Sequence, residues 1–389
     1  MSGGTSGSKN ALVAIAVLAG LTVAGLTLYY TRSSGPQTEQ LGALVPSMSE
    51  RVNDAALIEL TQADRSVTVR RSGEAWGVDE LGGYPASFEH VKPALVGLGL
   101  AERLETRTAR AENHAALGLA APQEGSTAVG LIVREEDGQP LAELVLGDQL
   151  APLPRSDDGV AMQQRFVRAA SEDQTYLAAF PIIRRVDPLD WVEPNVTSIA
   201  QGRVKRVTTR REGEAAVTIE RPSSMDQFVL IGDDAGASLV QNADRRLRGA
   251  LAFLRFNRVR PADDPAWAEA EGGPKRTGVF QLFDGTRVSV ELRPIGEDWY
   301  AALRSEYLPE ERVEAEGERI VDVETVQQRL DGFAALHGPW LYRFREGLID
   351  NLCPPREEIV QRESAGDEES VGEGPLVPEA TPVPSEPEG

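Results

Sequence analysis

Three histidines, one cysteine and three adjacent aspartate pairs are the side chains of this sequence best suited to chemistry. Histidine binds metal ions and transfers protons near neutral pH, and paired carboxylates chelate calcium or act as acid and base. None of the histidines lies in a motif such as His-Glu-x-x-His, and no aspartate pair lies in an Asp-x-Asp-x-Asp-Gly loop. We therefore expect isolated surface or capping histidines and solvated turn carboxylates. The residues are His90, His114, His337, Asp157-Asp158, Asp233-Asp234 and Asp263-Asp264.

The single cysteine, Cys353, excludes an internal disulfide and leaves no Cys pair for zinc. Because it has no identifiable His or acidic partner, we expect a lone thiol near the end of the ordered region and not a nucleophile. The sequence also has no Gly-x-x-x-x-Gly-Lys-Ser/Thr loop for ATP phosphates and no Gly-x-Ser-x-Gly hydrolase elbow. It therefore predicts no catalytic, cofactor-binding or metal-ligating residue, no cofactor, and a protein that is not an enzyme.

Composition bounds the class of protein. A chain of 389 residues with 41% hydrophobic residues is long enough for two ordinary domains with cores. The formal net charge of −21 argues against a nucleic-acid partner, because phosphate binding requires clustered Lys and Arg. We expect no nucleic acid among its ligands.

An uncharged apolar run, ALVAIAVLAGLTVAGLTLYY, covers residues 11–30. At 1.5 Å per residue it is long enough to cross a hydrocarbon core of about 30 Å, and it predicts a membrane anchor from Ala11 to Tyr30. The alternative is a cleaved signal peptide, but the run is long and no Ala-x-Ala cleavage site follows it. Lys9 and the α-amino group together carry slightly more positive charge before the run than Arg32 does after it, so we predict a single-pass inner-membrane protein with its large C-terminal part in the periplasm.

The apolar spacing of one segment occurs twice in the chain. In each copy, strand-like alternation precedes the segment and a strand pair follows it, so the sequence predicts an internal duplication with one packed helix in each unit. We expect Asn242 to cap the second helix. The repeated positions are Val91, Leu95, Leu98 and Leu100, then Leu247, Leu251, Leu254 and Phe256.

Local signals predict further elements. Val67 and Val69 alternate, and so do Trp76 and Val78, on either side of a turn, which indicates a hairpin. Pro93 requires the first repeated helix either to start near His90 or to be kinked. A third helix is expected from Val323 to Phe333 with Asp322 as its cap. The alternating aromatic residues Trp340, Tyr342 and Phe344 indicate a strand or an extended clasp.

The predicted fold class is α+β: one N-terminal transmembrane helix, two duplicated units of mostly antiparallel strands with a packed helix, and a disordered acidic tail. The tail is Pro- and Glu-rich and lacks apolar periodicity. The predicted boundaries are a cytoplasmic N-terminus at 1–10, the anchor at 11–30, a tether at 31–51, a first unit at 52–190, a second unit at 191–352 and the tail at 353–389.

The succession of short motifs resembles a bacterial family known as domain of unknown function 4340. The resemblance covers roughly residues 52–352 and the anchor, and it departs from the family at Ser87, where an acidic residue is common. It implies association with membrane transport systems of the ABC type, including gliding-motility relatives, and the family has no established catalytic residues. The matching residues are Trp76, Pro85-Ala86, Gly118-Leu119-Ala120-Ala121-Pro122, Leu146-Gly147-Asp148, Phe166-Val167-Arg168, Tyr176 and Trp340-Leu341-Tyr342-Arg343-Phe344.

Two hypotheses about function follow. The first is a non-enzymatic, membrane-anchored periplasmic accessory or scaffold protein that works with an envelope transport complex of the ABC type. The alternative is a periplasmic ligand-binding module that uses the cleft between the two repeated units, because crevices between domains are common binding sites. An enzyme whose site is assembled from residues distant in sequence is a third reading.

Overall fold

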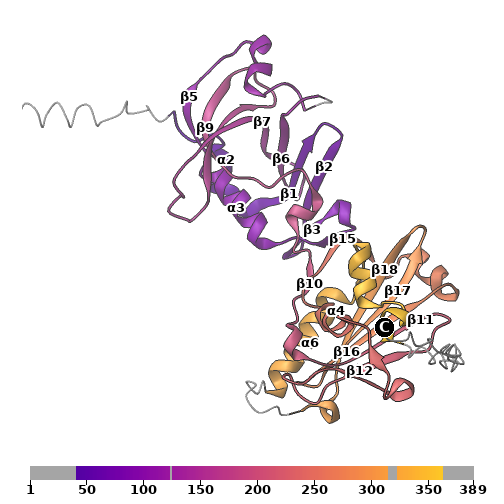
Figure 1. Cartoon of the computed structure of the whole chain (residues 1–389). Helices are drawn as coiled ribbons and strands as arrows, with labels where there is room; N and C mark the ends of the chain where they lie inside the picture. The colour runs from indigo at the N-terminus through magenta and orange to yellow at the C-terminus, as the bar shows by residue number, and fades with distance from the viewer. Residues whose placement is uncertain (1–40, 123–124, 314–321, 362–389) are drawn as a thin grey trace, which may run out of the picture. The chain divides into compact units, whose positions relative to one another are not determined.

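The computed structural model describes residues 41–122, 125–313 and 322–361 (Figure 1). The chain forms two compact units, Met1–Glu193 and Pro194–Gly389, which are called the N-terminal and the C-terminal unit below. Each unit has its own large antiparallel sheet.

The sheet of the N-terminal unit has nine strands. Its inward positions alternate along each strand, as in β2, where Val67 and Val69 are fully buried. The pairing of β2 with β3 confirms the predicted hairpin. In spatial order the strands are β4 (Tyr84–Pro85), β3 (Ala75–Val78), β2 (Arg65–Ser72), β1 (Ala55–Gln62), β6 (Val129–Glu135), β7 (Pro140–Pro152), β8 (Met162–Ala169), β9 (Thr175–Pro181) and β5 (Glu102–Thr106).

Two α-helices, α2 (Pro46–Arg51) and α3 (Phe88–Gly99), pack with this sheet. The apolar residues Val91, Leu95 and Leu98 of α3 are buried, as their helical spacing predicts. The helix begins at Phe88, two residues before the alternative start near His90, so Pro93 lies inside it. Five short 3-10 helices complete the unit: η1 (Val52–Asp54), η2 (Asp79–Leu81), η3 (Ala111–Asn113), η4 (Ala115–Leu117) and η5 (Pro188–Trp191).

The sheet of the C-terminal unit also has nine strands. In spatial order they are β10 (Asn195–Thr197), β15 (Leu254–Pro261), β19 (Trp340–Phe344), β18 (Asp298–Tyr307), β17 (Thr286–Ile295), β16 (Arg276–Leu282), β11 (Val204–Arg211), β12 (Val217–Glu220) and β13 (Val229–Ile231). A separate pair joins β14 (Ser238–Leu239) to β20 (Val360–Gln361).

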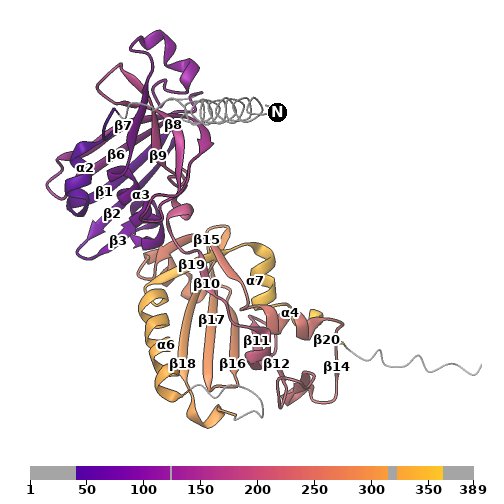
Figure 2. The same cartoon turned by 90° about the vertical axis from the view of Figure 1, so that its left-hand side faces the viewer.

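The described residues of this unit form four α-helices: α4 (Ala243–Gly249), α5 (Pro265–Glu269), α6 (Val323–His337) and α7 (Glu346–Leu352). The 3-10 helices are η6 (Gln201–Arg203), η7 (Gly232–Asp234), η8 (Ala270–Gly272), η9 (Pro309–Glu311) and η10 (Arg356–Glu358). Helix α6 runs alongside β18 (Figure 2). The side chain of Asp322 accepts the backbone N–H of Thr325, which confirms the predicted cap of α6.

Eight strands follow one another in the same spatial order in both units. The order is β3-β2-β1-β6-β7-β8-β9-β5 in the first and β13-β12-β11-β16-β17-β18-β19-β15 in the second. The two series also run in the same order along the chain. The units differ in their connections, because a short turn joins β8 to β9, whereas the segment between β18 and β19 contains α6.

The predicted fold class needs correction. In the described part of the chain, two large antiparallel sheets dominate and helices are few, so α+β overstates the helical content. The predicted class also named one N-terminal transmembrane helix. None of the described helices is long and apolar enough to cross a membrane, and the segment predicted as the anchor, residues 11–30, lies outside the described residues.

The repeated apolar spacing marks a helix only in part. Helix α4 ends at Gly249, and Leu254 and Phe256 lie in β15. Asn242 is the N-cap residue of α4, as predicted, but it has a positive φ of 64° and its side chain makes no capping hydrogen bond. Apolar residues three and two positions apart suit a helix followed by a strand as well as one long helix.

The predicted tether and tail both extend too far into the fold. Residues 41–51, predicted as tether, contain α2, whose Met48 side chain is fully buried. Residues 353–361, predicted as disordered tail, carry the fully buried side chains of Cys353 and Ile359 and end in β20. Few apolar residues can be recognised in such short segments, and only their partners in space show that they are buried. Residues 362–389 lie outside the description.

Candidate functional site

The three histidines lie apart from one another in the fold. His114 and His337 are 6% and 5% exposed, so the prediction of surface or capping histidines is wrong for these two. The Nε2 atom of His114 lies 2.9 Å from the carbonyl oxygen of Asp173, and the Nδ1 atom of His337 lies 2.7 Å from the Tyr342 hydroxyl. Burial lowers the pKa of His337 to about 4, so its imidazole is neutral at physiological pH.

The aspartate pairs have three different environments. Asp157 and Asp158 are exposed in a turn, as predicted. Asp264 caps α5 by accepting the N–H of Ala266, and its hydrogen bond from Arg260 lowers the pKa of its carboxyl group. Asp234 is 7% exposed and forms an ion pair with Arg356, so it is not a solvated turn carboxylate. No group of three His, Cys, Asp or Glu side chains in the described ranges could hold a metal ion.

Cys353 is fully buried, and burial raises the pKa of its thiol to about 12. A thiol that stays protonated and inaccessible is a poor nucleophile. Its position next to α7 is structural, because its backbone carbonyl accepts the Nε–H of Arg211 at 2.8 Å.

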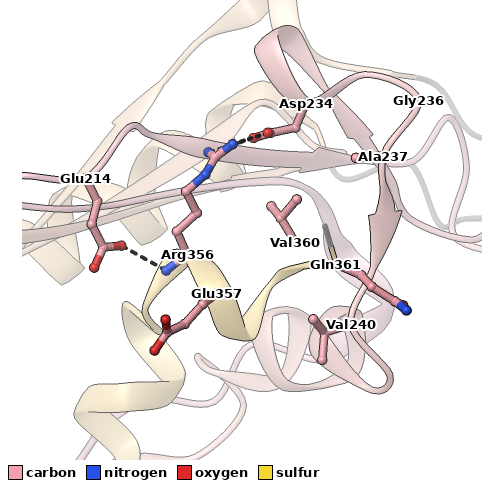
Figure 3. Close-up of a pocket in the computed structure, with 9 residues that line it drawn as sticks. All are labelled: Glu214, Asp234, Gly236, Ala237, Val240, Arg356, Glu357, Val360 and Gln361. Atoms are coloured by element: carbon pink, nitrogen blue, oxygen red, sulfur yellow. Dashed lines mark hydrogen bonds and ion pairs between the residues drawn. The ribbon is translucent and has the colours of Figure 1, made fainter. Parts of the chain in front are cut away.

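A pocket of about 910 Å³ lies where the C-terminal segment meets the rest of its unit (Figure 3). The guanidinium group of Arg356 points at the Asp234 carboxylate, and the Arg356 backbone N–H donates to Glu214 at 2.8 Å. Glu357 and Val360 also line this pocket. Its buried charges, those of Arg356 and Asp234, already form an ion pair with each other. They hold the C-terminal segment in place and do not require a ligand.

A different situation occurs in a pocket of about 370 Å³ in the N-terminal unit, called the Arg165 pocket below. Its walls come from the end of β1, the start of β6 and the central parts of β7 and β8, beside the segment that follows β9. Its lining residues are Leu60, Gln62, Arg65, Thr127, Val129, Leu146, Gly147, Asp148, Gln149, Arg165, Ile183, Arg184, Arg185 and Val186.

Arg165 is a buried cation with almost no partners. Its side chain lies on the inward side of β8 with Val167, and the residue is 6% exposed. Its Nε donates to the carbonyl oxygen of Gly147 at 3.0 Å, and among the described residues no carboxylate lies within ion-pair distance of it. Burial lowers its pKa to about 10 although the charge of Asp148 raises it, so the guanidinium remains protonated at neutral pH.

The rim of the pocket adds further positive charge. Arg65 and Arg184 are exposed there, and Arg65 donates to the side chain of Gln62. Arg185 lines the pocket too, but its guanidinium is bound by Asp190 at 2.8 Å. Asp148 supplies the single acidic side chain of the lining. The pocket therefore has a net positive lining, with its most buried charge at Arg165.

Close packing of two glycines shapes this region. A Cβ atom on Gly118 would lie 2.4 Å from Oδ1 of Asp148, and one on Gly147 would lie 2.3 Å from the carbonyl oxygen of Leu117. Arg168 donates to the Leu119 carbonyl oxygen at 3.4 Å. Three motifs far apart in the sequence, at residues 118–122, 146–148 and 166–168, thus meet beside the Arg165 pocket.

Strand pairing identifies the equivalent place in the C-terminal unit. Val78, Val69 and Ile58 lie side by side across β3, β2 and β1. They correspond to Leu230, Ile219 and Val207, which lie side by side across β13, β12 and β11. From these pairs, Gln62 aligns with Arg211, and the neighbouring strands align Val129 with Arg276 and Arg165 with Trp299.

At this equivalent place the C-terminal unit supplies its own carboxylate. Asp350 of α7 accepts hydrogen bonds from Arg211 at 2.9 Å and from Arg276 at 3.3 Å. The Arg276 guanidinium also lies over the ring of Trp299, 4.1 Å from its centroid. At this place, Arg211 and Arg276 are therefore paired with a carboxylate of the same chain, whereas Arg165 has no such partner among the described residues.

Sequence reasoning assigned no site residue, and so it missed Arg165. A signal was present, because Arg165 shares the inward parity of β8 with Gln163 and Val167, and a charged residue on the core-facing side of a strand is unusual. The family motif Phe166-Val167-Arg168 includes Arg168 but not Arg165. Arg168 donates to backbone carbonyl oxygens.

A family model described as "Domain of unknown function (DUF4340)" matches residues 76–271, which is half of the chain. The match runs from β3 in the N-terminal unit to η8 in the C-terminal unit and includes Arg165. Comparisons with curated proteins and with solved structures gave no match.

Proposed function

We propose, on the premise that the chain belongs to the DUF4340 family, that this protein acts by binding and that its N-terminal unit holds an anionic group of a partner at Arg165. The match to residues 76–271 confirms the family resemblance, and the family description assigns no activity. The proposal therefore depends on the chemistry of the Arg165 pocket.

One observation carries the proposal: a protonated guanidinium that is 6% exposed has no carboxylate partner in the described chain. Moving a charge out of water costs several kcal/mol unless a counter-charge and hydrogen bonds compensate it. A fold that keeps such a cation at the floor of an open pocket is suited to a ligand that supplies the missing anion.

The pocket favours a carboxylate over a more highly charged anion. The guanidinium group presents paired N–H donors that match the two oxygens of a carboxylate. Asp148 lies close enough to Arg165 to raise its pKa, so its charge would disfavour a dianion such as phosphate. At the equivalent place of the C-terminal unit, two arginines that align with Gln62 and Val129 bind a carboxylate, that of Asp350.

An acidic segment of another protein fits this chemistry and an accessory role. We include in the proposal that the two units work in the periplasm beside an ABC-type transport complex, as the family resemblance implies. Two observations support binding over catalysis: His337 is neutral and hydrogen-bonded in the core, and the Cys353 thiol is buried and protonated. The ligand site predicted between the two units stays a prediction.

Titration of the full-length protein with butyrate, a monocarboxylate of about the size of a glutamate side chain, and with inorganic phosphate tests the binding chemistry. The variant Arg165→Gln removes the buried charge, and Arg155→Gln, an exposed arginine that donates to Gly159, is the matched control. We expect butyrate to bind the parent and the control with equal affinity and to bind Arg165→Gln at least tenfold more weakly, measured by calorimetry. Equal affinity in all three proteins would contradict the site.

The accessory role has a separate test. Cells carrying the tagged parent, Arg165→Gln or Arg155→Gln are cross-linked, and the partners are compared by quantitative mass spectrometry. Recovery of a transporter subunit with the parent and control, and its loss with Arg165→Gln, is the expected result. A carboxylate site that works in vitro but leaves the set of partners unchanged would separate ligand binding from an accessory function.

A further inference from the structure

A further cavity, of about 230 Å³, lies in the C-terminal unit between α6 and the sheet. Its walls are mainly apolar, and they come from the helix on one side and from β10, β16 and β17 on the other. The apolar lining residues are Val196, Ile199, Leu282, Val288, Val326, Leu330 and Phe333.

Helix α6 covers the sheet incompletely. Within α6, Val326 is 1% exposed, whereas Leu330 and Phe333 on the same side are only half-buried. The sheet below offers deeply buried apolar side chains, such as Leu282 and Val288 at 1% and 2% exposure. Protein interiors normally pack such surfaces without a gap larger than a few atoms, so a cavity of this size between them is a place for a ligand.

The polar groups of the cavity indicate which head group the ligand carries. The hydroxyl oxygen of Ser305 is buried and has no hydrogen-bond partner among the described residues. Buried hydroxyl groups are nearly always hydrogen-bonded, so an acceptor or donor is missing here. Arg329 of α6 lines the same cavity, is exposed, and has no ion-pair partner in the described part of the chain.

Three other polar residues of the lining are already engaged. Thr197 donates to the Leu251 carbonyl oxygen at 2.8 Å, and Asp284 binds both Arg203 and the Thr286 N–H. The buried hydroxyl group without a hydrogen bond is therefore that of Ser305, and the charge without an ion pair in the described part of the chain is that of Arg329. Both groups favour an anionic oxygen acceptor.

We infer that the cavity under α6 binds a medium-chain monocarboxylate, with its apolar chain between α6 and the sheet and its carboxylate held by Ser305 and Arg329. A volume of about 230 Å³ accepts about eight methylene-sized groups at roughly 30 Å³ each. This site is independent of the proposed function, because it lies in the other unit and shares no residue with the Arg165 pocket.

Octanoate is the probe that fits this volume and charge, and octylammonium has the same chain with the opposite charge. We expect calorimetry with the full-length protein to detect octanoate binding that is at least tenfold tighter than octylammonium binding. Ser305→Ala should weaken octanoate binding several-fold. If octylammonium binds as tightly as octanoate, the assigned head-group chemistry is wrong.

Two substitutions on α6 separate the cavity from nonspecific binding to the helix. Leu330→Trp fills the cavity and should reduce octanoate affinity at least tenfold. Leu336→Trp changes a residue of the same helix that is 43% exposed and does not line the cavity, so binding should persist. Unchanged octanoate affinity in Leu330→Trp overturns the proposal.

A direct localisation remains decisive if Leu330→Trp fails to fold. A diazirine-bearing octanoic acid is photolysed with the parent protein, and the labelled peptides are mapped by mass spectrometry. Labels in α6, β16 or β17 that octanoate competes away support the site. Labels confined to other segments overturn it, whatever the result at Arg165.

Discussion

The two units are built on the same strand order but differ at one end of the sheet. In the C-terminal unit, α7 follows β19 and places Asp350 on Arg211 and Arg276. In the N-terminal unit, the segment after β9 forms only the 3-10 turn η5, and the equivalent region is the open Arg165 pocket. A repeated scaffold can thus be closed by its own chain in one copy and remain available to a ligand in the other.

One pair of equivalent positions explains why only one unit accepts α7. Gly278 of β16 aligns with Leu131 of β6, and both lie on the inward face. At Gly278 the absence of a side chain lets the backbone of Leu352 approach, because a Cβ atom would lie 2.8 Å from its carbonyl oxygen. Leu131 is fully buried and fills the corresponding space.

The largest expected effect contrasts two buried arginines, one in each unit. Arg221 is 1% exposed and donates to the carbonyl oxygens of Val204, Ser224, Gln201 and Gly202. Arg221→Met leaves these acceptors without their donor and should lower the free energy of unfolding by about 4 kcal/mol. Urea denaturation measures this change, and a loss below about 1 kcal/mol would show that the network is dispensable.

The next effect concerns the glycine that admits α7. Gly278→Ala places a methyl group against the Leu352 carbonyl and the Phe280 ring. It should lower the free energy of unfolding by about 2 to 3 kcal/mol. Because Cys353 is the only cysteine, undocking of α7 is measured by its alkylation rate, which should rise. Gly332→Ala on α6 is the control, since nothing lies near its Cβ position. Equal alkylation rates in both variants would contradict this role for Gly278.

A pH effect should arise at His337, on the helix α6 that has no counterpart in the described part of the other unit. The pKa of His337 falls from 6.5 to about 4 on folding. The unfolded chain therefore binds a proton at higher pH than the folded chain, and stability is lost as pH falls from 6.5 towards 4, by at most about 3 kcal/mol. In His337→Gln, unfolding free energies should depend less on pH in this range; identical slopes in both proteins would contradict the assignment.

The smallest change in unfolding free energy is expected at Arg165, and it should not have the destabilising sign expected for Arg221→Met. Without ligand, Arg165→Met exchanges a buried charge with one hydrogen bond for an apolar side chain. The free energy of unfolding should stay the same or rise by about 1 kcal/mol, in contrast to Arg221→Met. Urea denaturation of both variants gives the comparison directly. A loss as large as that of Arg221→Met would mean that Arg165 is structural.

Local patterns predicted several elements correctly. Alternation at Val67 and Val69 marked β2, and the Asp322 cap with its apolar spacing marked α6. They misjudged Leu254, because its spacing from Leu247 suits a helix, while pairing between β15 and β19 makes it part of a strand. The burial of residues 41–51 and 353–361 was also missed, since those segments are short and depend on distant partners.

The candidate site was beyond prediction for the same physical reason. The sequence by itself determined the alternation of strands, the repeated order of segments and the lone thiol, because these depend on neighbours along the chain. Only the tertiary structure decided that Arg165 is buried without a carboxylate while Arg211 and Arg276 share Asp350. Burial and charge pairing depend on which distant segment covers a side chain, and the two units differ in that covering segment.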